Sequence, residues 1–342
     1  MKVSVVIPTY NEERYIEGCL RSLLASDTED FSTEFLVIDG MSNDGTRTIV
    51  KQLSEEFPTI RLIDNEARNK PAALNLGIEH ALGDILIRVD AHAIYDRAYV
   101  SRTVYHIQNN DADNVGGIRR TLPSGNSKLA KGLAYAVSNP FAAGNAVYRT
   151  LPAEDGAETI VREVDTVFGG GFPKDLFSRI GGFNLQLLRG QDREFNHRIR
   201  ANGGKILLCT DIICDYYARS ELSAYVRWIY DGGATPFYIS RLTGDQIYSV
   251  RNLVPLAFLG SLVASTAIGF FSSIGWLLLG LITVFYLIGA FVFSWRVVKA
   301  ERNFAYFFIM PVIFLLTHIP YALGSLSGLL RPVRKDAKWV RS

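Results

Sequence analysis

The sequence of 342 residues has few cysteines and little net charge, and both features argue against whole classes of function. Its three cysteines, Cys19, Cys209 and Cys214, lack the close spacing of a structural metal site, so we expect reduced cytosolic thiols. The net charge of +2 does not favour a nucleic-acid-binding protein, because such proteins neutralise the phosphate backbone with many basic residues. Internal repeats and low-complexity runs are also lacking, and the first apolar strand begins at Val3, so we expect no signal peptide.

Long apolar segments, by contrast, fill the C-terminal part of the chain. Residues 253–271, 274–295 and 304–330 contain no Asp, Glu, Lys or Arg. A helix of about 20 apolar residues crosses a bilayer, so we predict an α-helical membrane region over residues 253–330. We expect the preceding residues 221–252 to form an amphipathic connector at the membrane surface.

Basic residues gather beside these segments, in the link 296–303 and in the tail 331–342. By the positive-inside rule we expect both to be cytoplasmic, in a multi-pass protein of the inner membrane whose N-terminal domain is also cytoplasmic. Three complete spans would place the tail on the other side. Because Pro311, His318 and Pro320 interrupt the third segment, we expect it to form a re-entrant or shallow hairpin. Three plain spans are the alternative.

Apolar and amphipathic segments alternate in the N-terminal part of the chain. Strands are expected at residues 3–7, 34–38, 60–63 and 85–89, and helices at residues 11–24, 46–57 and 71–82. This alternation predicts an α/β domain with a parallel sheet and helices on both faces. Ligands bind such sheets at the carboxyl ends of the strands, where Thr9, Asp39 and Asp90 all fall.

The triplet Asp90-Ala91-His92 follows the last of these strands and places a carboxylate and an imidazole on the same side of the chain. These two groups suit Mn²⁺ or Mg²⁺ carrying a diphosphate, and the imidazole favours Mn²⁺. The alternative is that Asp90 only caps the turn after the strand.

Four motifs occur in a fixed order: V-V-I-P-T-Y-N-E-E, D-G-M-S-N-D-G-T, D-A-H and, at residues 190–194, G-Q-D-R-E. Together they resemble the family 2 glycosyltransferases over residues 1–220. The run R-V-D-A-H-A is similar to the ExoA-type enzymes of succinoglycan and related exopolysaccharide pathways. The resemblance implies the GT-A fold, an α/β nucleotide-diphospho-sugar transferase domain whose mostly parallel sheet is flanked by helices.

The resemblance also implies which residues bind the donor, a UDP-sugar. They are Pro8, Thr9, Asn11, Glu12, Asp39, Lys70 and Asp90. Asp39 corresponds to the carboxylate that hydrogen-bonds the uracil, and Lys70 belongs to a segment that contacts base and ribose. Lys70 either reaches a phosphate as a point charge or is a solvated loop lysine. Asp90 and His92 stand where the family normally has Asp-x-Asp, which implies a divalent cation, Mn²⁺ or Mg²⁺.

On the acceptor side, Asp192 corresponds to the general base of the family, and Gln191 replaces the usual Glu before it. One fewer like charge would lower the pKa of the base. The alternative is that Asp192 only stabilises the start of a helix. Gly170 and Gly171 correspond to the region bordering sugar and acceptor, or form a flexible turn.

Arg227-Trp228 resembles the Gln-x-x-Arg-Trp motif of processive relatives, which holds diphosphate and the acceptor end, although Ala224 stands where the Gln would be. The other interpretation is an interfacial helix with its aromatic residues at the headgroup level.

The expected function is therefore an inverting, metal-dependent transfer of a hexose from a UDP-sugar, such as UDP-glucose. The expected acceptor is a saccharide linked to polyprenyl diphosphate in the membrane, in exopolysaccharide or cell-surface glycan synthesis. No nucleic acid is expected as a partner. Two alternatives remain open: a processive polysaccharide synthase, and a non-catalytic assembly protein that binds a nucleotide-sugar or glycolipid.

Overall fold

The computed structural model describes residues 1–144, 146–151 and 158–333, and the chain divides into two units. The first unit holds Met1–Arg120 and Leu151–Tyr216, and the second holds Thr121–Thr150 and residues 217–333. The expected domain boundary at residue 220 lies close to Tyr216, but the assignment of residues 121–150 to the second unit was not expected. Most of the basic tail expected at 331–342 lies outside the described residues.

The N-terminal strands form the parallel half of the sheet. They are β1 (Lys2–Thr9), β2 (Ser32–Asp39), β3 (Ile60–Asp64) and β4 (Ile85–Arg88), in the spatial order β3-β2-β1-β4. Val5 pairs with Phe35 on one side and with Ile87 on the other, and all three side chains are buried. The parallel pairing brings the carboxyl ends of these strands to one edge, as the sequence predicted.

The remaining strands make the sheet mixed. They are β5 (Ala93–Tyr95), β6 (Asn114–Pro123), β7 (Val161–Glu163), β8 (Phe168–Pro173) and β9 (Ile206–Ala218). β8 is antiparallel to both β4 and β6, and β9 is antiparallel to β5 and β7. The predicted parallel pairing therefore holds only for the N-terminal half. Because β8 runs against β4, its first residues lie at the edge where β4 ends.

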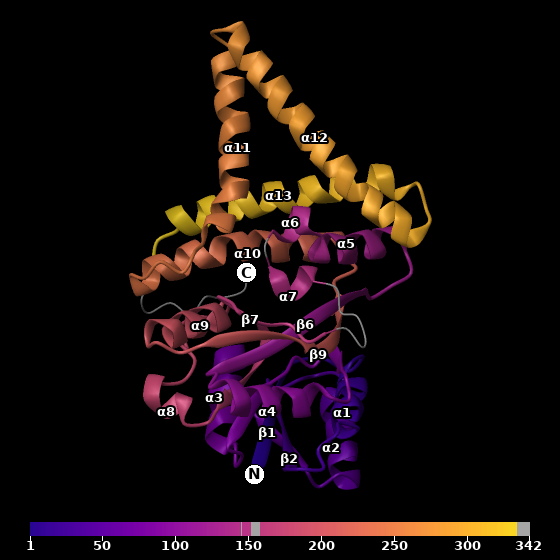
Figure 1. Ribbon diagram of the computed structural model, residues 1–342, viewed down its shortest axis with the longest axis vertical. Coiled ribbons are helices and arrows are strands. Elements are labelled where there is room, and N and C mark those ends of the chain that lie inside the picture. The colour runs from indigo at the N-terminus through magenta and orange to yellow at the C-terminus, as the bar shows by residue number, and fades with distance from the viewer. Residues whose placement is uncertain (145, 152–157, 334–342) are drawn as a thin grey trace. The chain divides into compact units, whose positions relative to one another are not determined.

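Helices flank this sheet (Figure 1). In the first unit they are α1 (Ile16–Leu24), α2 (Thr46–Glu56), α3 (Lys70–His80), α4 (Tyr99–Asn110), α8 (Leu176–Ile180) and α9 (Gln191–Ala201). The helix predicted from Asn11 instead begins at Ile16, because Asn11 has a φ of 54°, outside the helical range. α3 begins as predicted, since the Asn69 side chain accepts a hydrogen bond from the Ala72 amide and Pro71 follows in the first turn.

The second unit is helical apart from the ends of β6 and β9. Its helices are α5 (Lys128–Ser138), α6 (Pro140–Ala143), α7 (Val147–Thr150), α10 (Leu222–Thr243), α11 (Val250–Gly269), α12 (Ser273–Glu301) and α13 (Tyr306–Leu330). Within the described residues, α11, α12 and α13 are long and apolar enough to cross a membrane. α11 and α12 form a hairpin, and α13 runs across its base (Figure 1).

The predicted break in the third apolar segment is not found. α13 continues from Tyr306 to Leu330 through Pro311 and Pro320. Helices in an apolar environment tolerate proline when neighbouring elements restore the lost contacts. α10 is such a neighbour, and the Tyr225 hydroxyl lies 2.7 Å from the Thr317 hydroxyl.

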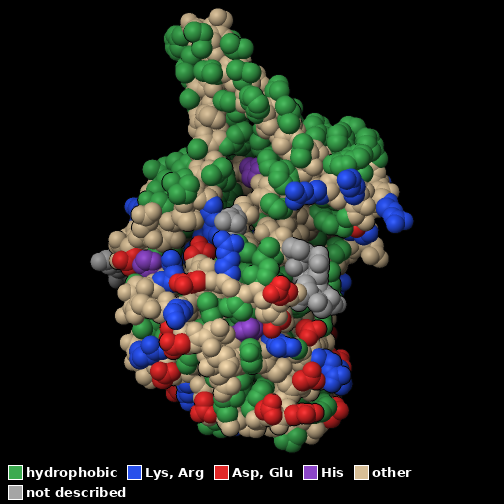
Figure 2. Space-filling view, viewed as in Figure 1, with side chains coloured by type: hydrophobic (Ala, Val, Ile, Leu, Met, Phe, Trp, Pro, Cys, Tyr) green, Lys and Arg blue, Asp and Glu red, His purple; other side chains and the backbone are tan. Residues whose placement is uncertain are grey.

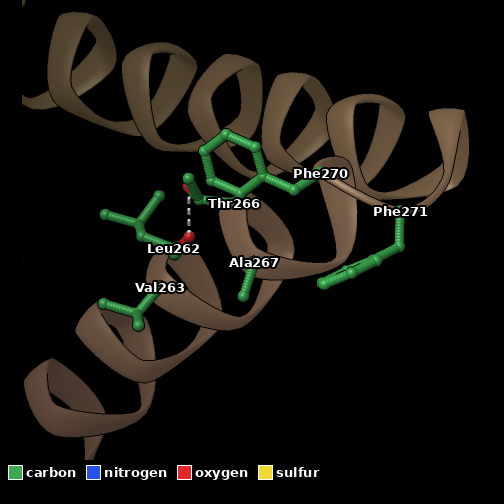
Figure 3. Close-up of a pocket in the computed structure, with 6 residues that line it drawn as sticks. All are labelled: Leu262, Val263, Thr266, Ala267, Phe270 and Phe271. Atoms are coloured by element: carbon green, nitrogen blue, oxygen red, sulfur yellow. Dashed lines mark hydrogen bonds between the residues drawn. The ribbon is translucent and has the colours of Figure 1, made fainter.

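Hydrophobic side chains cover the α11–α12 hairpin (Figure 2). Phe271, at its tip, is 93% exposed, which favours contact with lipid rather than water. A shallow pocket on α11 beside this tip is apolar as well (Figure 3); its lining residues are Leu262, Val263, Thr266, Ala267, Phe270 and Phe271. The hydroxyl of Thr266 donates to the Leu262 carbonyl oxygen, so no polar group is left to orient a ligand.

Candidate active site

The loops after β1 and β2 are joined by hydrogen bonds, which fixes the edge of the sheet where the donor residues were predicted. The Asn11 amide donates to the Ser42 hydroxyl at 2.8 Å, and the Asn43 amide donates to Asn11 Oδ1 at 3.0 Å. The Glu12 amide donates to Thr46 Oγ1, also at 2.8 Å. Pro8 and Thr9 end β1 immediately before this loop pair.

Asp39 is fully buried at the end of β2, and its carboxylate is already engaged. Oδ1 accepts from the Ser42 hydroxyl at 2.6 Å, and Oδ2 accepts from Arg47 at 2.6 Å. Arg47 also reaches Asp64, at 2.8 Å. Its hydrogen bonds to Asp39 and Asp64 raise the pKa of Arg47 above its usual value. A uracil that hydrogen-bonds Asp39 would share the carboxylate oxygens that accept hydrogen bonds from Ser42 and Arg47.

Asp90 lies directly after β4 and is held by two cations. Its Oδ1 lies 2.7 Å from Lys70 Nζ and 3.1 Å from a terminal nitrogen of Arg88. Burial acts to raise the pKa of Asp90, but the charges of Lys70 and Arg88 outweigh it and hold that pKa far below its usual range. Asp90 is therefore an anion at every pH at which the protein works. Lys70, the first residue of α3, is thus brought to Asp90 rather than left in a solvated loop.

His92 faces different partners from Asp90. Its Nδ1 lies 2.9 Å from Glu12 Oε1, and its Nε2 lies 3.3 Å from the Tyr216 hydroxyl. In the described part of the chain, no three His, Cys, Asp or Glu side chains are grouped as metal ligands. That His92 binds a metal stays a prediction. Asp90 still fits a cation carried by a diphosphate, because Mg²⁺ sites commonly use one carboxylate together with substrate phosphates and water.

Asp192 stands in the first turn of α9, where the helix dipole favours an anion. Its side chain is 43% exposed, so a substrate hydroxyl can reach it. Glu194, the other carboxylate of this turn, is 8% exposed and is bound by Arg198 at 2.6 and 2.9 Å. Gln191 is buried at the start of the helix. Asp192 is thus the more exposed of the two acids, and its role as base stays a prediction.

Arg88 links the two halves of this site, and the sequence argument did not single it out. One terminal nitrogen binds Asp90, and the other lies 3.9 Å from Asp192 Oδ2. The Arg88 side chain is 5% exposed and that of Asp90 is 10% exposed, so the pairing of these two residues is shielded from water, whereas Asp192 is open to it. The sequence feature that could have identified Arg88 is its position as the one arginine in an apolar strand, directly before Val89-Asp90.

Gly169, Gly170 and Gly171 lie inside β8, not in the flexible turn considered as the alternative. β8 begins at Phe168, directly before these glycines. Gly169 and Gly170 have φ values of 70° and 125°, which residues other than glycine rarely adopt. The Gly169 carbonyl faces Arg88 at 3.5 Å. The glycines therefore let backbone approach the charged centre.

Arg227 and Trp228 belong to α10 in the second unit. Arg227 is exposed and Trp228 is half-buried. Within the first unit, the structure brings Glu12 to His92, and it places Lys70, Asp90 and Asp192 around Arg88.

Comparisons with known proteins agree with this architecture. The profile of glycosyl transferase family 2 matches residues 4–163. The chain is 29% identical to the succinoglycan biosynthesis protein ExoA of Rhizobium meliloti over 259 residues, 74% of this chain and 74% of that protein.

A second relative comes from Methanococcus voltae and is named dolichyl N-acetyl-alpha-D-glucosaminyl phosphate 3-beta-D-2,3-diacetamido-2,3-dideoxy-beta-D-glucuronosyltransferase. It is 26% identical over 337 residues, 96% of this chain and 97% of that protein.

Among solved structures, the fold is similar to the mannosyltransferase PcManGT from Pyrobaculum calidifontis, solved with GDP-Man and Mn²⁺. The TM-score is 0.57 at 17% identity, covering 96% of this chain and 87% of that one. This likeness extends the fold comparison beyond the residues that the family profile matches. The four motifs in order, the mixed sheet, the profile match over residues 4–163 and these relatives together support the assignment of this chain to glycosyl transferase family 2.

Proposed function

We propose that this protein is an inverting glycosyltransferase that moves a hexose from a UDP-sugar, such as UDP-glucose, to a lipid-linked saccharide. The observation that carries the proposal is the position of Arg88, whose guanidinium lies 3.1 Å from Asp90 and 3.9 Å from Asp192. The carboxylate expected beside the diphosphate and the one expected to act as base therefore lie around one cation. The names of the Methanococcus voltae and Rhizobium meliloti relatives support a role in glycan assembly, the former on a lipid-linked phosphate.

The proposed reaction uses the side chains already described. Asp192 takes the proton from an acceptor hydroxyl, and the oxygen attacks the anomeric carbon from the face opposite UDP. The bond between that carbon and the phosphate oxygen breaks, and UDP leaves with the electron pair. Lys70 and Arg88 place positive charge beside the leaving diphosphate, which stabilises the charge that develops there. Inversion converts the α-linked donor into a β-linkage.

A divalent cation, Mn²⁺ or Mg²⁺, belongs to this proposal. Asp90 would hold it, with His92 as the second ligand that the sequence predicts. The cation would neutralise the diphosphate of the donor when it is bound. The similar fold solved with Mn²⁺ supports this part of the proposal only through the fold.

We further propose that the α11–α12 hairpin crosses the inner membrane twice and that the first unit is cytoplasmic, where nucleotide-sugars are made. α13 would lie along the cytoplasmic face rather than cross it. In support, 39% of its most apolar window is buried within the protein, against 17% for α11 and 11% for α12. An acceptor saccharide on polyprenyl diphosphate would then be presented in the same leaflet, for exopolysaccharide or cell-surface glycan synthesis.

The test is a screen of the purified full-length protein against a panel of UDP-sugars, with and without a polyprenyl-diphosphate-linked saccharide. The expected result is release of UDP from one donor, with a single sugar added to the lipid. Binding of the donor with no release under any condition would favour the assembly protein. A ladder of long products would favour the processive synthase.

A further inference from the structure

Trp228 of α10 carries two arginine side chains over its indole ring, and none of the motifs predicted this arrangement. The guanidinium carbon of Arg149, in α7, lies 5.4 Å from the ring centroid, and that of Arg219, just after β9, lies 5.7 Å from it. All three residues belong to the second unit. Residues 70 positions apart in the chain are thus brought to one aromatic ring.

Among the described residues, neither of these two guanidiniums forms an ion pair. In the described parts of the second unit, neither arginine has a carboxylate oxygen within 4.0 Å, the limit for a salt bridge. Arg149 donates one hydrogen bond through Nε, to the Tyr148 hydroxyl at 3.0 Å, which leaves its terminal nitrogens for another partner. Two like charges around one ring repel each other, and an anion between them removes that repulsion. The ring attracts both cations and holds them in place.

The helix that carries Trp228 also belongs to the apolar part of the second unit. One turn earlier on α10, Tyr225 is 1% exposed, and its hydroxyl contacts Thr317 of α13. Trp228 is half-buried beside these apolar helices, and tryptophan is enriched at the headgroup level of a bilayer. Arginine forks match the geometry of phosphate oxygens, and basic pockets at this level bind lipid phosphates.

We propose that Arg149, Arg219 and Trp228 form a binding site for the phosphate group of the lipid acceptor. The identity of that lipid as an acceptor rests on the proposed function, whereas the site itself rests on the geometry above. The motif that contains Trp228 implies contact with the diphosphate and the acceptor end. In this proposal the ring instead acts through Arg149 and Arg219, which it orients toward a lipid phosphate.

The experiment measures binding of a polyisoprenyl phosphate to the full-length protein in detergent. The competitors are the matching polyisoprenol, which lacks the phosphate, and UDP. Arg149→Ala and Arg219→Ala should each weaken binding of the polyisoprenyl phosphate about 10- to 100-fold, because each removes a charge-assisted contact. Both variants should leave binding of UDP and of the polyisoprenol unchanged. Lys128→Ala, which removes an exposed positive charge on α5, is the matched control and should bind all three like the unchanged protein.

Trp228→Phe should keep part of the affinity and Trp228→Leu should lose most of it, since only the former retains a ring for the guanidiniums. Unchanged binding of the polyisoprenyl phosphate in Arg149→Ala and Arg219→Ala would overturn the site. If the arginine variants lost affinity for UDP to the same extent, the arginines would belong to the donor site. If they lost affinity for the polyisoprenol to the same extent, the arginines would have a structural role. Either outcome would also overturn the proposed phosphate site. Because this readout needs no transfer, it can succeed even if the proposed reaction fails.

Discussion

At the scale of single residues, Asp90 is a buried anion held between Lys70 and Arg88. Asp90→Asn leaves both cations without their partner in a shielded site. We expect this substitution to lower the free energy of unfolding by about 3–5 kcal/mol, the usual effect of breaking a buried ion pair from one side. Chemical unfolding in detergent is the measurement. Glu17→Gln is the control: its pair with Arg21 is about half exposed on both sides, and it should change stability by less than about 1 kcal/mol.

The pairing of Asp90 with Lys70 and Arg88 also predicts how the stability of the protein depends on pH. The pKa of Asp90 is lower in the folded protein than in the unfolded chain, where an aspartate titrates near about 3.9. The contribution of ionised Asp90 to the free energy of unfolding is therefore fully present above that value. It is lost as the pH falls toward the pKa of Asp90 in the folded protein. The stability difference between the unchanged protein and Asp90→Asn should be constant from pH 7 to about 5 and shrink below about 4. A difference that instead grows on acidification would contradict the assignment.

Asp192 is the exposed acid of its helix turn, so its loss should affect chemistry rather than binding. Asp192→Asn keeps the shape of the side chain but cannot accept a proton. We expect transfer to fall about 10²- to 10⁴-fold while UDP binding, measured by calorimetry, is retained. If this variant transfers sugar at nearly the original rate, Asp192 only stabilises the helix start, and Glu194 becomes the candidate base.

Removal of divalent cations tests the role of Asp90 in another way. Excess chelator should abolish transfer, and adding back Mn²⁺ should restore it at least as well as Mg²⁺, because an imidazole near the site favours Mn²⁺. The measurement is UDP release at saturating donor. Full turnover in chelator would refute the metal requirement and leave Lys70 and Arg88 as the charges that stabilise UDP.

At the scale of elements, β8 approaches α4 closely because Gly171 has no side chain. A Cβ at this position would lie 2.3 Å from Thr103 Cγ2, and such overpacking typically costs about 1–3 kcal/mol. Gly171→Ala should therefore lower the midpoint of thermal unfolding, and adding Thr103→Ser should restore most of it by removing that methyl group. Gly125→Ala, whose Cβ would have no neighbour nearer than 3.8 Å, is the matched control. A double variant no more stable than Gly171→Ala would show that this contact is not the cause.

At the scale of the whole molecule, the membrane topology depends on whether α13 crosses the membrane or lies along its surface. If α11 and α12 alone cross the membrane, Arg302 and Pro332 lie on the cytoplasmic side and Ser272 lies outside. An impermeant thiol reagent applied to intact cells should then label Ser272→Cys but neither Arg302→Cys nor Pro332→Cys. Cys19, Cys209 and Cys214 are free and buried, so they give little background. Labelling of Pro332→Cys would demonstrate three spans instead.

Local patterns in the sequence were enough for much of this protein. Apolar β-branched runs predicted the four parallel strands to within a residue or two, and the helix predicted from Pro71 begins one residue earlier, at Lys70. Uncharged runs predicted the apolar helices, because length and polarity alone decide whether a helix suits a bilayer. The strand ends then indicated which carboxylates share an edge of the sheet.

Only the tertiary structure showed which of these groups meet. Glu12 lies 80 positions from His92, and Arg88 lies 104 positions from Asp192, yet each pair is in contact or nearly so. The antiparallel pairing of β8 with β4, and the positions of Arg149 and Arg219 around Trp228, likewise join segments that are distant in sequence. No local pattern encodes such contacts, because they depend on how distant segments pack, and packing also overrides the prolines that suggested a break in α13. The sequence by itself determined the elements and the chemistry available; the fold decided which charges face one another.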